Sequence, residues 1–81
     1  MTAIPLLCFV AGDSLGVLVL VDDHDTVADL AVVAQQAAAV RVAPRTHAAV
    51  YAHGGELDLG ATVKEVGLVA LDRIDVAPEA G

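Results

Sequence analysis

The segment from Val27 to about Val40 is the one stretch of this chain that predicts a helix of several turns. Thr26 is the predicted N-cap, because its hydroxyl can accept a hydrogen bond from a free amide of the first turn, and Asp29 completes a capping box. Arg41 is expected to end the helix, where a cation suits the helix dipole, and Pro44 prevents any continuation. The apolar residues that recur at helical spacing are Val27, Leu30, Val33, Ala34 and Ala37.

A single helix with one apolar stripe must cover that stripe with other elements, and the sequence before it predicts strands. Ile4 to Val10 is apolar and rich in strand formers, and Leu15 to Val21 is dense in Val and Leu. Gly12-Asp13-Ser14, between these runs, is a turn signal. The chain is therefore expected to begin with a β-hairpin.

The part of the chain that follows the helix predicts short strands with one helical turn among them. Ala48 to His53 is expected to form a strand with Val50 and Tyr51 on opposite faces, and Gly54-Gly55 is a turn. The remaining expected elements are a short strand at Leu57–Leu59, a helical turn over Val63–Val66 capped by Thr62, a final strand marked by Leu71, Ile74 and Val76, and a tail over Ala77–Gly81.

This order of elements predicts an α+β fold of the β-grasp, or ubiquitin-like, type. One main helix packs across a mixed sheet, and a short helical turn precedes the last strand. The main alternative, a ferredoxin-like fold, needs a second full helix, for which the latter half of the chain has no room. We expect one ubiquitin-like domain over residues 1–81, with a core over about 4–76 and the tail at 77–81.

The composition indicates a permanent partner. The chain is 57% hydrophobic and 19% charged, with a mean hydropathy of +0.70 and an excess of Ala, Val and Leu. A domain of 81 residues is too small to bury all of that surface, and apolar surface left outside usually marks a contact site. The helix face opposite the predicted stripe is a candidate contact surface, because it carries only Ala28, Val32, Gln35, Gln36 and Ala39.

Charge and hydropathy exclude other classes of partner. The net charge of −7 argues against nucleic acid, which needs a basic footprint, and against anionic membrane surfaces. The longest apolar run, Ala3–Ala11, is too short to span a bilayer, so no membrane insertion is expected. One cysteine cannot form an intrachain disulfide, and the first residues do not predict a secretory signal. We expect a cytoplasmic protein.

A search for metal or nucleophile chemistry yields weak patterns. Asp22, Asp23, His24 and Asp25 could form a surface site for a hard cation, but a polar turn that caps the helix is the favoured interpretation. No Glu-x-x-His pair, of the kind that holds a diiron centre, occurs in the chain. Cys8 lies in an apolar run without a basic neighbour, which is typical of an inert packing residue.

Two further patterns resemble catalytic or phosphate-binding motifs. Ser14 lies in Gly-Asp-Ser-Leu-Gly, which resembles a motif of GDSL hydrolases, yet its place between two strands favours a turn. Gly54-Gly55 lacks the Lys-Ser/Thr that a phosphate-binding loop carries. We therefore expect no catalytic, cofactor-binding or metal-binding residues.

Docking residues are more plausible than catalytic ones. Arg41 and Arg45 flank Val42-Ala43-Pro44 in a chain with only four Lys or Arg, and arginines form bidentate pairs with carboxylates of a partner. The alternative is a helix cap plus a solubilising loop residue. Aromatic and arginine side chains are enriched in binding hot spots. The candidate docking residues are Arg41, Pro44, Arg45, Tyr51 and His53.

These residues also carry a resemblance to a known family. Arg41-Val42-Ala43-Pro44-Arg45, followed by a strand that ends Val50-Tyr51-Ala52-His53, resembles the γ subunits of bacterial diiron toluene and alkene monooxygenase hydroxylases. Leu59 to Leu68, then Ile74-Asp75-Val76, and the strand from Val17 to Asp22 are also similar in pattern. The resemblance covers residues 4 to 76.

The resemblance implies a function. Such γ subunits are ubiquitin-like and non-catalytic, and they dock on the large α subunit of a hydroxylase built of two αβγ protomers. The α subunit carries the diiron centre, and the NADH-dependent complex oxidises aromatic hydrocarbons, alkenes or isoprene. The implied partners are the α and β subunits, and this chain is implied to hold no cofactor.

A ubiquitin-like sulfur carrier or modifier is the alternative function. Those proteins share the fold but use a C-terminal Gly-Gly, whereas this sequence ends Glu79-Ala80-Gly81.

Overall fold

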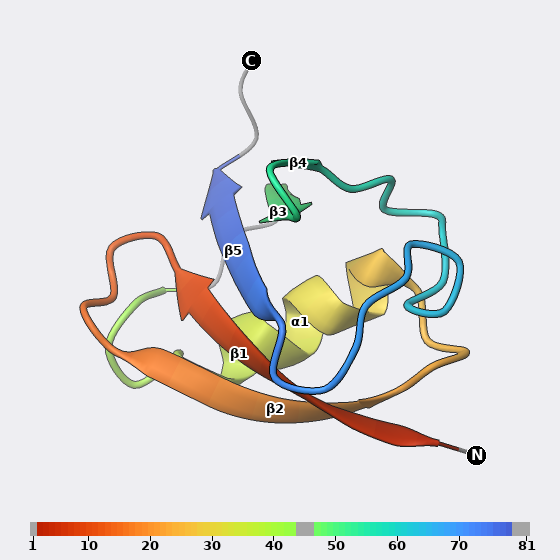
Figure 1. Cartoon of the computed structure of the whole chain (residues 1–81). Helices are drawn as coiled ribbons and strands as arrows, with labels where there is room; N and C mark the ends of the chain where they lie inside the picture. The colour runs from red at the N-terminus through yellow and green to blue at the C-terminus, as the bar shows by residue number, and fades with distance from the viewer. Residues whose placement is uncertain (1, 44–46, 79–81) are drawn as a thin grey trace.

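Among the residues that the structure describes, five strands form one mixed sheet that curves around one helix (Figure 1). The computed structural model describes residues 2–43 and 47–78. The strand order is β2-β1-β5-β3-β4, with β1 and β5 parallel at the centre and every other pair antiparallel. The elements are β1 (Ala3–Val10), β2 (Gly16–Asp22), α1 (Val27–Ala37), β3 (Ala48–Ala52), β4 (Gly55–Glu56) and β5 (Arg73–Pro78). This is the ubiquitin-like β-grasp arrangement that the sequence predicts.

The core lies between α1 and one face of the sheet. Alternate residues of each strand point toward the helix, as the two-residue period of a strand requires. On the helix side, Val27, Leu30 and Ala34 are fully buried. The strand residues that meet them are Leu6, Cys8, Val10, Val19, Val21, Val50, Ile74 and Val76. Val50 therefore faces inward and Tyr51 outward.

The start of the helix follows the predicted cap. The Thr26 hydroxyl accepts a hydrogen bond from the backbone N–H of Asp29, and the Asp29 carboxylate accepts one from the backbone N–H of Thr26, each at 3.1 Å. Both bonds satisfy amides that have no partner inside the first helical turn. The capping box is confirmed.

The end of the helix differs from the prediction. Ala37 is its last residue and Ala38 its C-cap, whereas the sequence predicted a helix to about Val40 that Arg41 would end. The chain turns earlier because the N–H groups of Arg41 and Val42 both donate to the Ala38 carbonyl oxygen, each at 2.9 Å. This turn lets Val42 pack against the core.

The buried stripe of the helix is also rotated from the predicted one. Ala31 and Ala38 are buried, whereas Ala37, assigned to the stripe, is exposed. Gln35, assigned to the outer face, is only 7% exposed. The reason is that the helix contacts the sheet through two rows of four-residue steps, residues 27, 31 and 35 and residues 30, 34 and 38, so positions 31, 35 and 38 turn inward.

The β3–β4 hairpin corrects two strand boundaries. β3 ends at Ala52 rather than His53, because His53 has a φ of +53° and Gly54 a φ of +82°. Positive φ values at both residues of a two-residue loop match the twist of a tight hairpin. Gly55 therefore pairs with Ala52 directly after the loop. The short strand is therefore Gly55–Glu56 and not Leu57–Leu59.

The segment before β5 contains the predicted helical turn. The Thr62 hydroxyl accepts from the N–H of Glu65, whose carboxylate accepts from the N–H of Thr62, and the N–H of Val66 donates to the Thr62 carbonyl oxygen. The buried side chains of Val63 and Leu68 pack this turn against the core.

The last strand is displaced along the chain from its predicted position. Leu71 has a φ of +67° and lies in the turn before β5, outside the strand it was expected to mark. At the other end, Ala77 and Pro78, expected in the tail, belong to β5 and pair with Ala49 and Ala48.

Candidate interaction surface

The face of the sheet that points away from α1 brings several polar and aromatic side chains together. Tyr51 pairs with Asp75 of β5, Asp75 pairs with Phe9 of β1, and Phe9 pairs with Gly16 of β2. Directly paired residues share a face, so these side chains form one row across the outer face.

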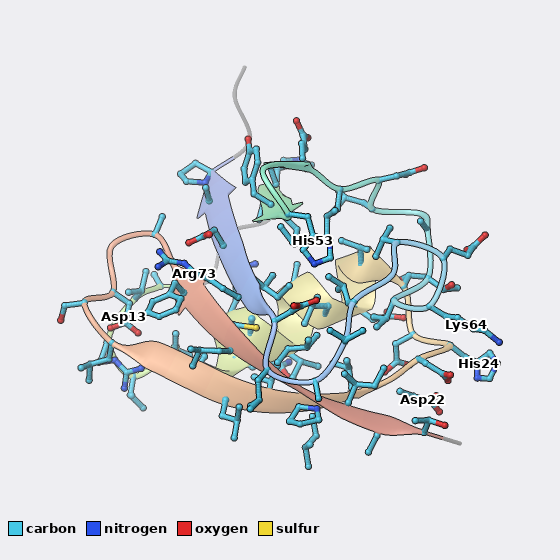
Figure 2. All side chains as sticks on the ribbon, in the orientation of Figure 1. Asp13, Asp22, His24, His53, Lys64 and Arg73 are labelled. Carbon is cyan, nitrogen blue, oxygen red and sulfur yellow. The ribbon has the colours of Figure 1, made fainter. Side chains whose placement is uncertain are left out.

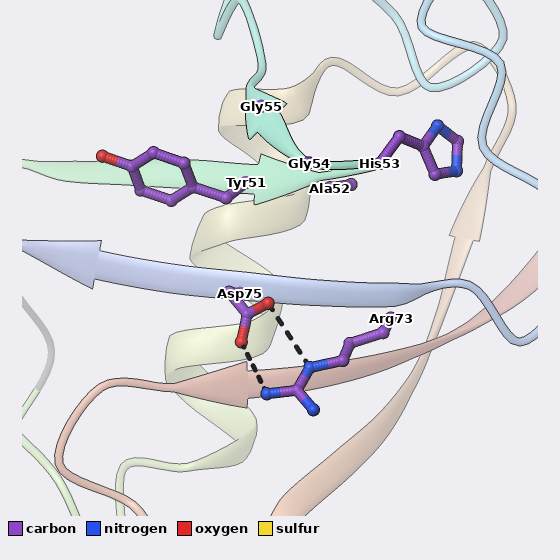
Figure 3. Close-up of a pocket in the computed structure, with 7 residues that line it drawn as sticks. All are labelled: Tyr51, Ala52, His53, Gly54, Gly55, Arg73 and Asp75. Carbon is purple, nitrogen blue, oxygen red and sulfur yellow. Dashed lines mark hydrogen bonds and ion pairs between the residues drawn. The ribbon is translucent and has the colours of Figure 1, made fainter.

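A hollow of about 270 Å³ lies over β3 and β5 at this row (Figure 3). The Arg73 guanidinium pairs with the Asp75 carboxylate at 3.2 and 3.4 Å and also lies 4.3 Å from the centre of the Phe9 ring. The Arg73 side chain is largely exposed and that of Asp75 is about half exposed, so water screens the pair. The lining residues are Tyr51, Ala52, His53, Gly54, Gly55, Arg73 and Asp75.

His53 has a structural partner at the edge of this hollow. Its Nε2 lies 2.9 Å from an oxygen of Asp72, and the same oxygen accepts the backbone N–H of Val69 at 2.9 Å. The Val69 N–H, and after it the His53 ring, lower the pKa of Asp72 below its usual value. The imidazole is directed away from Tyr51 (Figure 3) and joins the β3–β4 hairpin to the turn before β5.

Arg41 lies in a different part of the molecule. Its guanidinium donates to both carboxylate oxygens of Asp13 at 2.8–2.9 Å. This side-chain hydrogen bond lowers the pKa of Asp13 and raises that of Arg41. Asp13, at the β1–β2 turn, lies at the left of the view, apart from His53 near its centre (Figure 2).

The predicted docking residues are therefore not one cluster. Tyr51 and His53 line the same hollow, whereas Arg41 is bound to Asp13. Pro44 and Arg45 lie outside the described residues. The docking role of all five stays a prediction.

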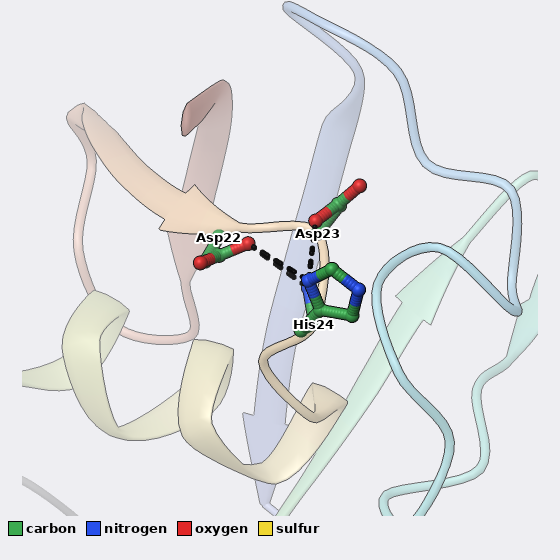
Figure 4. Close-up of side chains that lie close together, drawn as sticks. All are labelled: Asp22, Asp23 and His24. Carbon is green, nitrogen blue, oxygen red and sulfur yellow. Dashed lines mark hydrogen bonds and ion pairs between the residues drawn. The ribbon is translucent and has the colours of Figure 1, made fainter. Parts of the chain in front are cut away.

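The acidic turn between β2 and α1 has the geometry of a polar turn (Figure 4). His24 Nδ1 lies 3.0 Å from an Asp23 oxygen and 3.5 Å from an Asp22 oxygen. Asp22 accepts the backbone N–H of His24, the main cause of its lowered pKa, and Asp25 accepts the N–H of Asp22. The potential ligand atoms of Asp22, Asp23 and His24 lie within 4.8 Å of one another, but the Asp22 carboxylate already accepts a backbone hydrogen bond of the turn.

Cys8 and Ser14 are placed as the sequence predicts. Cys8 is fully buried in β1, and burial, with a smaller effect of Asp75, raises the pKa of its thiol to about 11. It therefore stays protonated at neutral pH. Ser14 lies in the exposed turn between β1 and β2, and the neighbouring carboxylate of Asp13 is bound to Arg41.

A second exposed surface was missed by the sequence reasoning. Leu18 and Leu20 of β2 point away from the helix and are 61% and 67% exposed. Their neighbours Val17, Val19 and Val21 are also apolar. The sequence of β2 therefore shows no alternation of polar and apolar residues that would tell its inner face from its outer face. The sequence signal that could have revealed this surface is the alternation of side-chain type along β2. Residues that point toward the helix are valines, and those that point away from it are leucines.

The fold defines a ubiquitin-like protein, and solved structures agree. The ubiquitin-like domain of an Arabidopsis thaliana protein matches with a TM-score of 0.73 and 23% identity, over 100% of this chain and 82% of that one. Caldiarchaeum subterraneum ubiquitin matches with a TM-score of 0.75 and 15% identity, over 99% of this chain and 98% of that one. These likenesses show the fold alone.

The sequence identifies the family within that class. The model of the toluene-4-monooxygenase system protein B family matches residues 3–77, and the chain belongs to this family. A chain of a structure described as toluene 4-monooxygenase HD complex with the inhibitor 4-bromobenzoate matches with a TM-score of 0.84 and 33% identity, over 96% of this chain and 100% of that one. None of the curated proteins matches the chain significantly. The resemblance stated from the sequence is confirmed.

Proposed function

We propose that this chain is a non-catalytic structural subunit of a multicomponent diiron monooxygenase hydroxylase. It docks on the large α subunit and stabilises an (αβγ)₂ assembly, with the β subunit as its second partner, and this assembly oxidises aromatic or alkene hydrocarbons. The observation that carries the proposal is the full-length match to a chain of a toluene 4-monooxygenase complex. Membership of the protein B family supports it.

The described side chains support a structural role over a catalytic one. The thiol of Cys8 is buried and protonated, the Arg41 guanidinium binds Asp13, and His53 binds Asp72. A carboxylate-bridged diiron centre needs Glu-x-x-His pairs on bundled helices, and the sequence contains none. We therefore assign the iron, and the oxygen chemistry that it supplies, to the α subunit, and no cofactor to this chain.

The setting that we propose for the assembly is the cytoplasm. The single cysteine is a free thiol, which suits a reducing compartment. Among residues 2–43 and 47–78, no helix is long and apolar enough to cross a membrane. The net charge of −7 disfavours nucleic acid as a partner.

Co-expression with the α and β subunits of a hydroxylase from the same source tests the proposal. The three chains are expected to co-elute in equal amounts during size-exclusion chromatography, and hydrocarbon oxidation is expected only when α is present. Omission of this chain should lower the yield of assembled α. If the chain elutes separately, and α is equally stable and active without it, the proposal is wrong.

A ubiquitin-like sulfur carrier or modifier is the alternative, and it rests on the fold alone. Incubation with ATP and an activating enzyme, followed by mass spectrometry, separates the two functions. A C-terminal adenylate or thiocarboxylate would favour the alternative, whereas a structural subunit should keep its mass.

A further inference from the structure

The outer face of the β1–β2 hairpin carries a group of exposed apolar side chains. Leu18 of β2 pairs with Leu7 of β1, and Leu20 pairs with Pro5, so the four residues share one face. The N–H of Leu71 donates to the Pro5 carbonyl oxygen at 2.6 Å, which places Leu71 beside the same strand. We call Pro5, Leu7, Leu18, Leu20 and Leu71 the hairpin patch.

Three of the four leucines in the hairpin patch are highly exposed, whereas Leu7 is partly buried. Leu20 and Leu71 are each 67% exposed and Leu18 is 61% exposed. Exposed single leucines are ordinary, but adjacent ones on paired strands form continuous apolar surface of the kind that marks a contact site.

Leu71 combines two features that do not stabilise the isolated chain. Its φ of +67° lies in the left-handed region, which glycine and asparagine adopt far more readily than leucine. Its side chain also leaves apolar surface in water. Backbone strain of this kind clusters at functional sites, so a leucine here indicates a role outside the fold of the chain.

β2 is an unprotected edge of the sheet, as Figure 1 shows. Its seven residues carry no charge before Asp22, contain no proline and pair with β1 in an unbroken register. The opposite edge strand, β4, has only two residues. Long apolar edges are normally shortened, charged or covered, and a partner can provide the cover for β2.

The charged residues around the hairpin patch indicate which kind of protein covers it. Three carboxylates lie around it, because Asp22 ends β2, Asp72 follows Leu71, and Asp75 lies beyond Phe9. One cation lies directly beside it, since Arg73 is the β5 partner of Leu7. The described Lys and Arg residues are Arg41, which binds Asp13, Arg73, which binds Asp75, and Lys64, which lies in the turn after Thr62. A second copy, with a net charge of −7, would bring like charges to this border. The complementary surface is therefore apolar with basic residues around it.

The outer face of α1 is the weaker candidate. Val32 is 52% exposed, but Ala28, Gln36 and Ala39 around it are small or polar. Gln35, which was expected to extend that face, is buried. The helix therefore offers less continuous apolar area than the hairpin patch.

We propose that the hairpin patch is the surface through which this chain docks on the large hydroxylase subunit. That subunit presents an apolar area bordered by lysine or arginine. This inference rests on the proposed function and adds to it the contacting face and the chemistry of the partner.

Competition between variants in the assembled hydroxylase tests the proposal. Leu18→Thr/Leu20→Thr keeps strand-forming residues on β2, and Leu71→Gly or Leu71→Asn suits the left-handed backbone. Val32→Thr/Val40→Thr is the matched control, since both of its valines are exposed and lie outside the patch. Each variant is co-expressed with wild-type chain, α and β, and mass spectrometry gives the ratio of the two forms in the complex.

The patch variants are expected to be incorporated at least about tenfold less than wild type, since burial of each leucine contributes to binding. The control should be incorporated equally. The melting temperature of the free Leu71→Gly chain should be unchanged or raised, which separates lost docking from lost folding. Affinity of the wild-type chain for the α–β complex should fall as salt is raised.

Three results would overturn the inference in different ways. Equal incorporation of the patch variants, or selective loss of the Val32→Thr/Val40→Thr control, would place the docking face elsewhere. If the affinity of the chain for the α–β complex does not change with salt, the lysine or arginine border proposed for the large subunit is wrong. Failure of the wild-type chain to join the complex would refute the proposed function itself.

Discussion

Arg41 binds both carboxylate oxygens of Asp13, which joins the chain after α1 to the turn between β1 and β2. The two residues are 28 positions apart, and the Asp13 side chain is almost fully covered. The donors are Nε and Nη2, so the edge of the guanidinium that they form is engaged within the chain and is not available to a partner. Arg41 therefore contributes first to the fold.

The Arg41–Asp13 pair makes stability depend on pH. The pKa of Asp13 is lowered in the folded chain, chiefly by the Arg41 side chain, so the unfolded chain binds its proton more readily. The stabilisation is fully present above the ordinary aspartate pKa of 3.8 and is lost as pH falls through the lowered folded value. Urea denaturation at several pH values should show Arg41→Ala less stable than wild type at pH 7, with the gap closing in acid. A gap that does not change with pH would contradict this role.

Charge reversal distinguishes the role of Arg41 in folding from the predicted role of Arg45 in docking. Arg41→Glu places a carboxylate against Asp13 and should lower the melting temperature of the free chain. Arg45→Glu tests the docking prediction for Arg45, and we expect it to weaken assembly with the α subunit. Thermal melts and pull-down yields of the two single variants measure both effects. Equal pull-down yields for Arg45→Glu and wild type would remove Arg45 from the docking surface.

The capping box at the start of α1 gives a stability prediction. Thr26→Ala removes the oxygen that accepts the Asp29 N–H and should cost about 1 kcal/mol of unfolding free energy. Thr26→Ser keeps a hydroxyl and is the matched control. Urea denaturation followed by circular dichroism measures both. A Thr26→Ser variant as unstable as Thr26→Ala would show that the methyl group, not the hydroxyl, matters.

The features that could be predicted from sequence are those that neighbouring residues determine. The cap at Thr26 and the turn at Thr62 each depend on a residue three positions further along, so a local pattern is sufficient. The end of α1 could not be predicted, because the turn at Ala38 is completed by contacts that reach Asp13 and the core. The short strand was misplaced because the φ values of His53 and Gly54, which set the hairpin, have no clear sequence signature at His53.

The candidate surface was predictable only in part for a related reason. Period-two alternation placed Val50 and Tyr51 on opposite faces, but the packing of the helix decides which face is outer. Leu18 and Leu20 are exposed because β2 is an edge strand and none of the described elements covers its outer face. Strand order depends on long-range pairing, such as that of β1 with β5, which no local pattern in the sequence reveals.

Gly16 is predicted to be required for the packing of Phe9. A Cβ at Gly16 would lie 2.9 Å from the Phe9 ring, which also stacks on Arg73. Gly16→Ala should displace the ring and cost about 1–2 kcal/mol, in the range of overpacked sites. Gly55→Ala, where a Cβ meets nothing within 4 Å, is the matched control and should be nearly neutral. Equal unfolding free energies for the two variants would contradict this account.

Cys8 is predicted to be unreactive until the chain unfolds. Its thiol is buried beneath the helix, and its pKa is raised to about 11. A disulfide reagent at pH 8 should label the native chain slowly and the urea-unfolded chain within the mixing time, because only the thiolate reacts. The raised pKa also means that the unfolded chain loses this proton first, so stability should fall as pH rises from 9 toward 11. Cys8→Ala removes the titrating group, so the stability of this variant should fall less between pH 9 and pH 11 than that of wild type.

In the labelling experiment, a fast reaction of the native chain would show that the thiol is accessible, contrary to its place in the core.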